Sequence, residues 1–153
     1  MKRIRINPSI EYIEPHGGRK LYACSGLALS GRVKVVIDTN PGRNETRDFL
    51  RDFDPDIAII SHYHPDHSSW GASVLEHTHA ELFVPEDEER CFRSLDHAVT
   101  TSEGGGEMGG IMKLFAESHL LYSEIDAFIT YDSPLSFIFG DISLECIRSS
   151  GHS

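Results

Sequence analysis

The 153-residue sequence has no apolar run that approaches the ~20 residues needed to cross a membrane. Its start, residues 1–6, is basic, but Asn7 and Pro8 interrupt it before the apolar core that a secretion signal requires. We therefore expect a cytoplasmic protein that makes no contact with a membrane.

Cysteine is also scarce. The three cysteines, Cys24, Cys91 and Cys146, lie far apart, and no Cys-x-x-Cys pair occurs. Neither a zinc ribbon nor a disulfide framework is therefore indicated. We expect all three side chains to serve as small apolar groups in the interior.

The chain also has fewer basic than acidic residues. The chain has 14 Lys and Arg against 24 Asp and Glu, which gives a formal net charge of −10. Because phosphate contacts need clustered basic side chains, a nucleic-acid partner is not expected. The hydrophobic content of 39% and the charged content of 25% are those of a soluble globular protein with a core.

What the sequence does contain is a dense group of chemistry-bearing residues at 61–67, Ser-His-Tyr-His-Pro-Asp-His. The group follows the apolar run 57–60, which is typical of a buried strand, and a strand end is a rigid base for several converging side chains. Imidazole and carboxylate together suit zinc, iron or manganese better than calcium, which prefers oxygen ligands. Four candidate ligands so close together can serve two adjacent metals: His62, His64, Asp66 and His67.

At these residues the chain resembles the metallo-beta-lactamase superfamily, whose signature is His-x-His-x-Asp-His after a strand. Asp38, which ends the apolar run 33–37, resembles the early strand-end aspartate of that family, and residues 151–153, Gly-His-Ser, resemble its next histidine element. The resemblance runs from about residue 21 to the last residue. It implies an α/β protein of the αββα sandwich type, of which the chain covers the first half and the opening strands of the second.

The resemblance also implies a role for each motif residue. His62, His64 and His152 would bind a first metal, and Asp66 and His67 would bind a second. The expected cofactor is one or two zinc ions, with iron or manganese as alternatives. Asp66 is the expected catalytic residue, because its carboxylate could also handle the proton that passes to the leaving group.

Asp38 has two readings. It could be a turn aspartate that caps its own loop, which is common. It could instead be a hydrogen-bond acceptor that holds residues 61–67, the histidine turn, in place. The resemblance favours the second reading.

A metal-bound hydroxide attacking an ester, thioester, lactone or phosphodiester of a small molecule is the activity that the resemblance implies. In the family the last ligands of the second metal lie downstream of the Gly-His element, where this chain has no residues. We therefore expect residues 1–153 to form a single partial domain of a truncated chain. The alternative is a non-catalytic or degenerate metal-binding fragment. An inner sheet face without its partner exposes apolar area, so self-association through that face is also expected.

Periodicity and turn residues predict the remaining elements. Residues 1–19 are expected to form one strand and a loop, and residues 100–110, with five glycines, a connector. Residues 100–122 as a whole are a candidate lid or insertion. Ser68 and Ser69 are candidate caps of a helix that follows the histidine turn. Helices are further expected over 45–53, 85–99 and 111–122, and strands over 21–29, 32–37, 57–60, 80–84, 126–131, 135–139 and 142–147.

Overall fold

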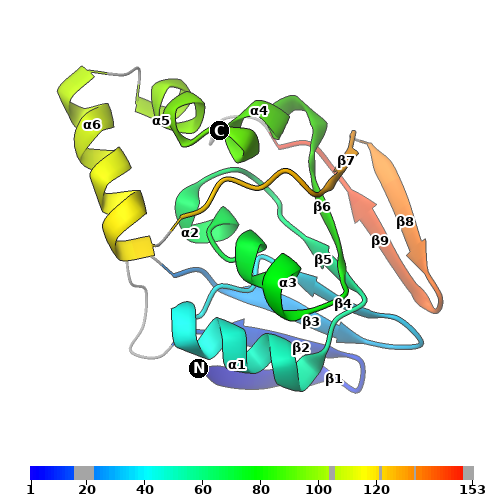
Figure 1. The fold of residues 1–153 in the computed structure, drawn as a ribbon. Coiled ribbons are helices and arrows are strands. Elements are labelled where there is room, and N and C mark those ends of the chain that lie inside the picture. The colour runs from blue at the N-terminus through cyan, green and yellow to red at the C-terminus, as the bar shows by residue number, and fades with distance from the viewer. Residues whose placement is uncertain (16–22, 104–105, 121, 133, 150–153) are drawn as a thin grey trace.

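The computed structural model describes residues 1–15, 23–103, 106–120, 122–132 and 134–149. They form three layers (Figure 1): helices cover one face of a seven-stranded sheet, and a two-stranded sheet lies against the other face. Among these residues, no helix has both the length and the apolar character needed to span a bilayer.

The large sheet keeps its strands in chain order. Its strands are β1 (Lys2–Asn7), β2 (Ile10–Glu14), β3 (Gly26–Ser30), β4 (Lys34–Ile37), β5 (Ile57–Ile59), β6 (Glu81–Pro85) and β7 (Ile129–Tyr131). β1 to β4 form an antiparallel meander, whereas β4 to β7 run parallel and are joined by helical crossovers. The second sheet is the antiparallel hairpin of β8 (Leu135–Phe139) and β9 (Ile142–Cys146).

Six α-helices lie in the described residues. They are α1 (Arg43–Phe53), α2 (Pro65–Ser68), α3 (Gly71–His77), α4 (Glu89–Arg93), α5 (Leu95–Glu103) and α6 (Gly106–Phe115). A 3₁₀ turn, Glu86–Glu88, precedes α4, and a π-helical turn, Ala116–Leu120, follows α6.

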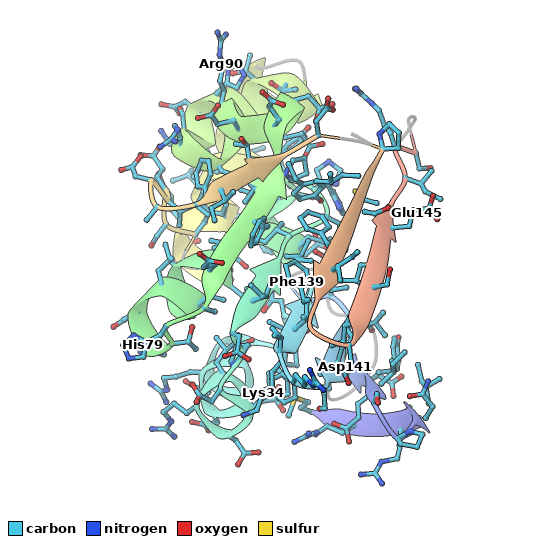
Figure 2. All side chains as sticks on the ribbon, turned by 90° about the vertical axis from the view of Figure 1, so that its right-hand side faces the viewer. Lys34, His79, Arg90, Phe139, Asp141 and Glu145 are labelled. Carbon is cyan, nitrogen blue, oxygen red and sulfur yellow. The ribbon has the colours of Figure 1, made fainter. Side chains whose placement is uncertain are left out.

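The central strand β5 contributes to two cores. Ala58 and Ile60 belong to the core under the helices, whereas Ile57 and Ile59 belong to the core under the hairpin. This division follows from the alternation of side chains along a strand. Figure 2 shows the hairpin from its outer side, with Phe139 at the interface with the large sheet. Because β5 is covered on both faces, it reads as an unbroken apolar run in the sequence.

Several sequence predictions are confirmed. The helix expected over 45–53 is α1, the buried strand over 57–60 is β5, and the strand over 80–84 is β6, parallel to β5. The hairpin turn expected before Ile142 is present, with Gly140 at a φ of 63°.

Two predictions near the chain start and the histidine turn were wrong. Residues 2–14 form two paired strands rather than one strand and a loop, because the Asn7 side chain accepts the N–H of Ser9 and closes a tight turn. Ser68 does not cap a following helix, because Pro65 already starts α2 and the Ser68 hydroxyl donates to the carbonyl of Tyr63.

The predictions over 85–122 also need correction. The expected single helix over 85–99 is broken at Ser94, which is extended. The expected connector is helical at Thr100–Glu103 and at Gly106–Gly110. In the second stretch, Gly109 allows α6 to pack closely on α5. A Cβ at this position would lie 3.1 Å from a side-chain carbon of Val99. A lid role for residues 100–122 stays a prediction.

Candidate metal centre

The candidate site lies where two neighbouring parallel strands end. β4 ends at Ile37 and is followed by Asp38, while β5 ends at Ile59 and is followed by the turn 61–67, called here the histidine turn. Because the carboxyl ends of parallel strands meet at one edge of the sheet, Asp38 faces the turn. Pro65 at the first helical position then folds the end of the turn into α2, which carries Asp66 and His67.

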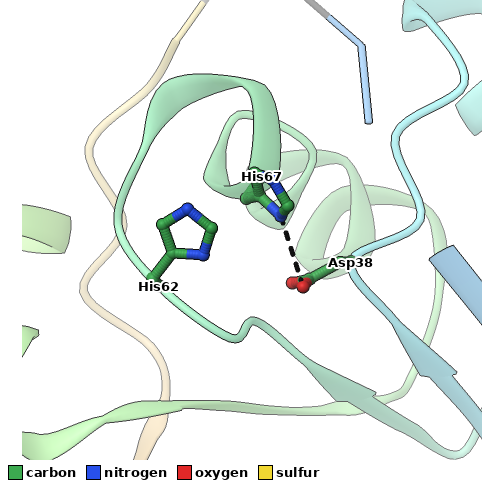
Figure 3. Close-up of side chains that lie close together, drawn as sticks. All are labelled: Asp38, His62 and His67. Atoms are coloured by element: carbon green, nitrogen blue, oxygen red, sulfur yellow. Dashed lines mark ion pairs between the residues drawn. The ribbon is translucent and has the colours of Figure 1, made fainter. Parts of the chain in front are cut away.

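Three side chains converge at this edge (Figure 3). One ligand atom from each of Asp38, His62 and His67 lies within 4.8 Å of the other two. Nδ1 of His67 lies 3.2 Å from Oδ2 of Asp38. Two imidazole nitrogens and one carboxylate oxygen at this spacing fit a zinc, iron or manganese ion.

His64 and Asp66 flank this cluster. The His64 ring centroid lies 4.8 Å from that of His62, edge to face, and Oδ2 of Asp66 lies 3.7 Å from Nε2 of His67. The four predicted ligands that lie in the described part of the chain are therefore all close together at one turn. His152, the remaining predicted ligand, lies outside the described residues, and its role stays a prediction.

The Asp38 carboxylate connects two parts of the histidine turn. Its Oδ1 accepts the backbone N–H of Ser61 at 2.8 Å, while its Oδ2 faces His67. Asp38 has a φ of 47°, a left-handed conformation that aspartate tolerates better than most residues. The sequence predicts a supporting role for Asp38, whereas its closeness to the two imidazoles also allows it to act as a ligand.

The site is electronegative. Burial alone lowers the pKa of His67, but the contact with the Asp38 carboxylate and the charges of Asp38 and Asp66 outweigh burial, so the net pKa is raised. The same field that favours a protonated imidazole favours a bound cation. Cys24 is a poor competitor as a ligand, because burial and the nearby Asp38 charge raise the pKa of its thiol, which donates to the carbonyl of Asp38.

A pocket of about 130 Å³ opens beside the histidine turn. Ser61 of the turn forms part of its wall, and its hydroxyl oxygen lies 2.9 Å from Nδ1 of His62. Charged groups of both signs, including Glu88, Asp132 and Arg148, share the wall with apolar side chains such as Ile147. The pocket is therefore a largely polar space that reaches the histidine turn at Ser61.

Sequence comparison identifies the family. Residues 25–141 match the sequence model of the metallo-beta-lactamase superfamily. The chain belongs to the metallo-beta-lactamase superfamily. This result confirms the resemblance inferred from the histidine turn. Comparison with curated proteins gives no match.

Solved structures show the same fold. MEM-A1, a subclass B3 metallo-beta-lactamase from a soil metagenome library, has a TM-score of 0.71 and 14% identity over 100% of this chain and 54% of its own. BJP-1, a subclass B3 enzyme of Bradyrhizobium japonicum, has a TM-score of 0.69 and 15% identity over 100% and 53%. The class B3 di-zinc enzyme LRA-12 from an Alaskan soil metagenome has a TM-score of 0.64 and 16% identity over 100% and 54%.

These likenesses confirm the predicted fold class of the superfamily. The chain spans about half the length of the solved structures that it matches. At these identities the comparison establishes the fold alone, because one fold can carry many different functions.

Proposed function

We propose that the protein is a metal-dependent hydrolase that uses zinc bound at the histidine turn. The observation that carries this proposal is the convergence of Asp38, His62 and His67 at the edge of the sheet. Two further findings support it: the family to which the chain belongs, and the description of its structural relative LRA-12 as a di-zinc enzyme.

The proposed ligand sets are those that the family resemblance implies. His62 and His64, together with His152, would hold one zinc ion, and Asp66 and His67 would hold a second. Zinc, when bound, acts as a Lewis acid that lowers the pKa of a water molecule and polarises the oxygen of the scissile group. All other steps depend on how the protein side chains orient the ligands and move protons.

Asp38 orients the second set. Its carboxylate accepts from Ser61 and faces His67, so it fixes both the start of the turn and the direction of one imidazole ring. Asp66, which follows Pro65 in the first turn of α2, is the residue that we propose to hold a proton and deliver it to the leaving group.

The substrate is proposed to reach the centre through the pocket beside Ser61. Its polar wall, with Arg148 and Asp132, suits a small molecule with polar substituents around an ester, thioester, lactone or phosphodiester bond. Which of these bonds is cleaved is the first question for experiment.

The test is a substrate panel with controlled metal content. The chain, first stripped by a chelator and then reloaded with zinc, is assayed against one ester, one lactone, one thioester and one phosphodiester. We expect hydrolysis of at least one class that is lost on chelation, restored by zinc and strongly reduced in Asp66→Asn. His79→Ala, at an exposed histidine after α3, is the matched control and should behave like the parent.

Two outcomes would contradict this proposal. Zinc binding without turnover on any substrate would indicate a non-catalytic metal-binding chain, and an absence of zinc binding would remove the proposed metal centre altogether.

A further inference from the structure

The histidine turn has little regular structure of its own to hold it. β5 ends at Ile59, and α2, which receives the turn, is only four residues long. A short helix leaves most of its terminal N–H and C=O groups without partners inside the helix. The positions of the ligand side chains therefore depend on contacts that the backbone of the turn makes with other segments.

Asn40 supplies one such contact. This residue, 4% exposed, lies in the loop between β4 and α1, and its Nδ2 donates to the backbone carbonyl of Asp66 at 2.6 Å. The same nitrogen lies 3.1 Å from Oγ of Ser69, just beyond α2. Because the carbonyl of Asp66 can only accept, the amide nitrogen of Asn40 has to face the turn.

The direction of the Asn40 amide is fixed from the other side. Its Oδ1 accepts the hydroxyl of Thr46, a residue of α1 that is 1% exposed, at 3.4 Å. Its backbone carbonyl accepts the N–H of Cys24 at 2.9 Å, which holds its main chain. The amide is therefore presented to the turn in one orientation.

Glu88 supplies a second contact from a different part of the chain. It ends the 3₁₀ turn after β6, and its Oε2 accepts the backbone N–H of Tyr63 at 2.7 Å. Tyr63 lies between His62 and His64, and its ring, 3% exposed, belongs to the core under the helices. A bond to this N–H fixes the peptide that separates two predicted ligands.

We propose that Asn40 and Glu88 are positioning residues of the metal centre, which hold the backbone of the histidine turn at Asp66 and at Tyr63. This inference rests on the proposed function, because it takes the side chains of the turn as zinc ligands. Both residues act through the backbone that carries the ligands. Removing outer contacts of this kind weakens metal affinity by about 10- to 100-fold.

The experiment measures zinc affinity of the full chain by competition with a chromophoric chelator. Asn40→Ala and Glu88→Leu are expected to bind zinc about 10- to 100-fold more weakly than the parent. Glu88→Gln is the rescue variant, because its carbonyl oxygen can still accept the N–H of Tyr63, and its affinity should stay close to that of the parent.

Two matched controls test whether the position of the side chain matters. Thr39→Val removes a buried hydroxyl next to Asn40 that donates to the carbonyls of Leu27 and Ile37, away from the turn. Glu86→Leu removes an exposed carboxylate from the same 3₁₀ turn as Glu88. Both controls should bind zinc as the parent does.

The absorption spectrum of the cobalt-loaded chain separates positioning from general stability. The proposal expects an altered cobalt spectrum in Asn40→Ala and Glu88→Leu at saturating metal, because ligand geometry has changed. Lower thermal stability of the metal-free variants with parent-like zinc affinity and cobalt spectra would assign both residues a purely structural role and overturn the inference. If the parent itself binds no zinc, the proposed function falls and this inference falls with it.

Discussion

The two faces of the seven-stranded sheet are covered differently, one by helices and the other by the β8–β9 hairpin. Under the helices, Phe92, Leu50 and Val74 are fully buried and belong to one continuous core. Under the β8–β9 hairpin, Phe137, Phe139 and Leu144 are only partly buried. On the helix side the packing side chains are therefore fully removed from water, whereas on the hairpin side the sheet residues are buried but several hairpin side chains stay partly exposed.

The candidate metal centre is attached to the helix side. Tyr63 and Trp70, within and just after the histidine turn, belong to the core under the helices. The turn thus obtains its rigidity from the helix side, whereas the hairpin side borders the adjacent pocket through Cys146 and Arg148. Self-association through an exposed sheet face, expected from the sequence, stays a prediction.

The largest expected effect compares one phenylalanine from each core. Phe92→Ala should lower the free energy of unfolding by about 3–5 kcal/mol, because a fully buried ring leaves a cavity. Phe137→Ala should lower it by about 1–2 kcal/mol, because that ring is already partly hydrated. Urea denaturation measures both values, and equal losses would contradict the difference between the two cores.

Zinc binding should increase the difference in stability between the helix side and the hairpin side. Free zinc at about 100 times its dissociation constant should raise the free energy of unfolding by about 2.7 kcal/mol, and a chelator should reverse the gain. Hydrogen exchange should slow more in residues 57–77 than in residues 135–146, because the turn is anchored on the helix side. Stronger protection of the hairpin would contradict this assignment of the anchor.

The smallest expected effect concerns the attachment of the hairpin at low pH. The backbone N–H of Arg32 donates to Oδ1 of Asp141 at 2.7 Å and holds the pKa of that carboxyl below its ordinary value. A lowered pKa means that the ionised form stabilises the folded state above the unfolded-state pKa, about 4. This contribution is lost as the pH falls through the folded-state pKa.

The amide of Arg32, followed by NMR, should therefore exchange faster as the pH is lowered through this range, after correction for intrinsic exchange. Asp141→Asn keeps an oxygen acceptor but cannot titrate, so this pH dependence should disappear. The amide of Ile60, which donates to the backbone carbonyl of Phe83 and belongs to the core under the helices, is the internal reference. A parallel change at Ile60 would show that the whole fold, and not the hairpin contact, responds to pH.

The parts of the fold that the sequence predicted are those with a strong local pattern. The apolar run 57–60, the amphipathic stretch 45–53 and the glycine before Asp141 each determine their element through periodicity or turn chemistry. The glycines at 106–110 predict a connector, but the structure has a helix there, because close packing of α6 on α5 outweighs their weak helix propensity.

The residues of the candidate site could be predicted from the sequence, but the hydrogen bonds that hold the histidine turn could not. The spacing of His62 and His67 predicted a metal site, and the run before Asp38 placed that residue at a strand end. The contacts of Asn40 with Asp66 and of Glu88 with Tyr63 join residues 26 and 25 positions apart. No local pattern marks such a pair, so these two side chains emerged only from the folded structure.

The central claim is that the histidine turn is a metal centre, and anomalous diffraction at the zinc edge from zinc-loaded crystals tests it most directly. The account predicts a peak about 2.0–2.1 Å from imidazole nitrogens of the turn, at His62, His64 or His67. Zinc peaks confined to histidines outside the turn, such as His77 and His79, with none at the edge of β5, would contradict it.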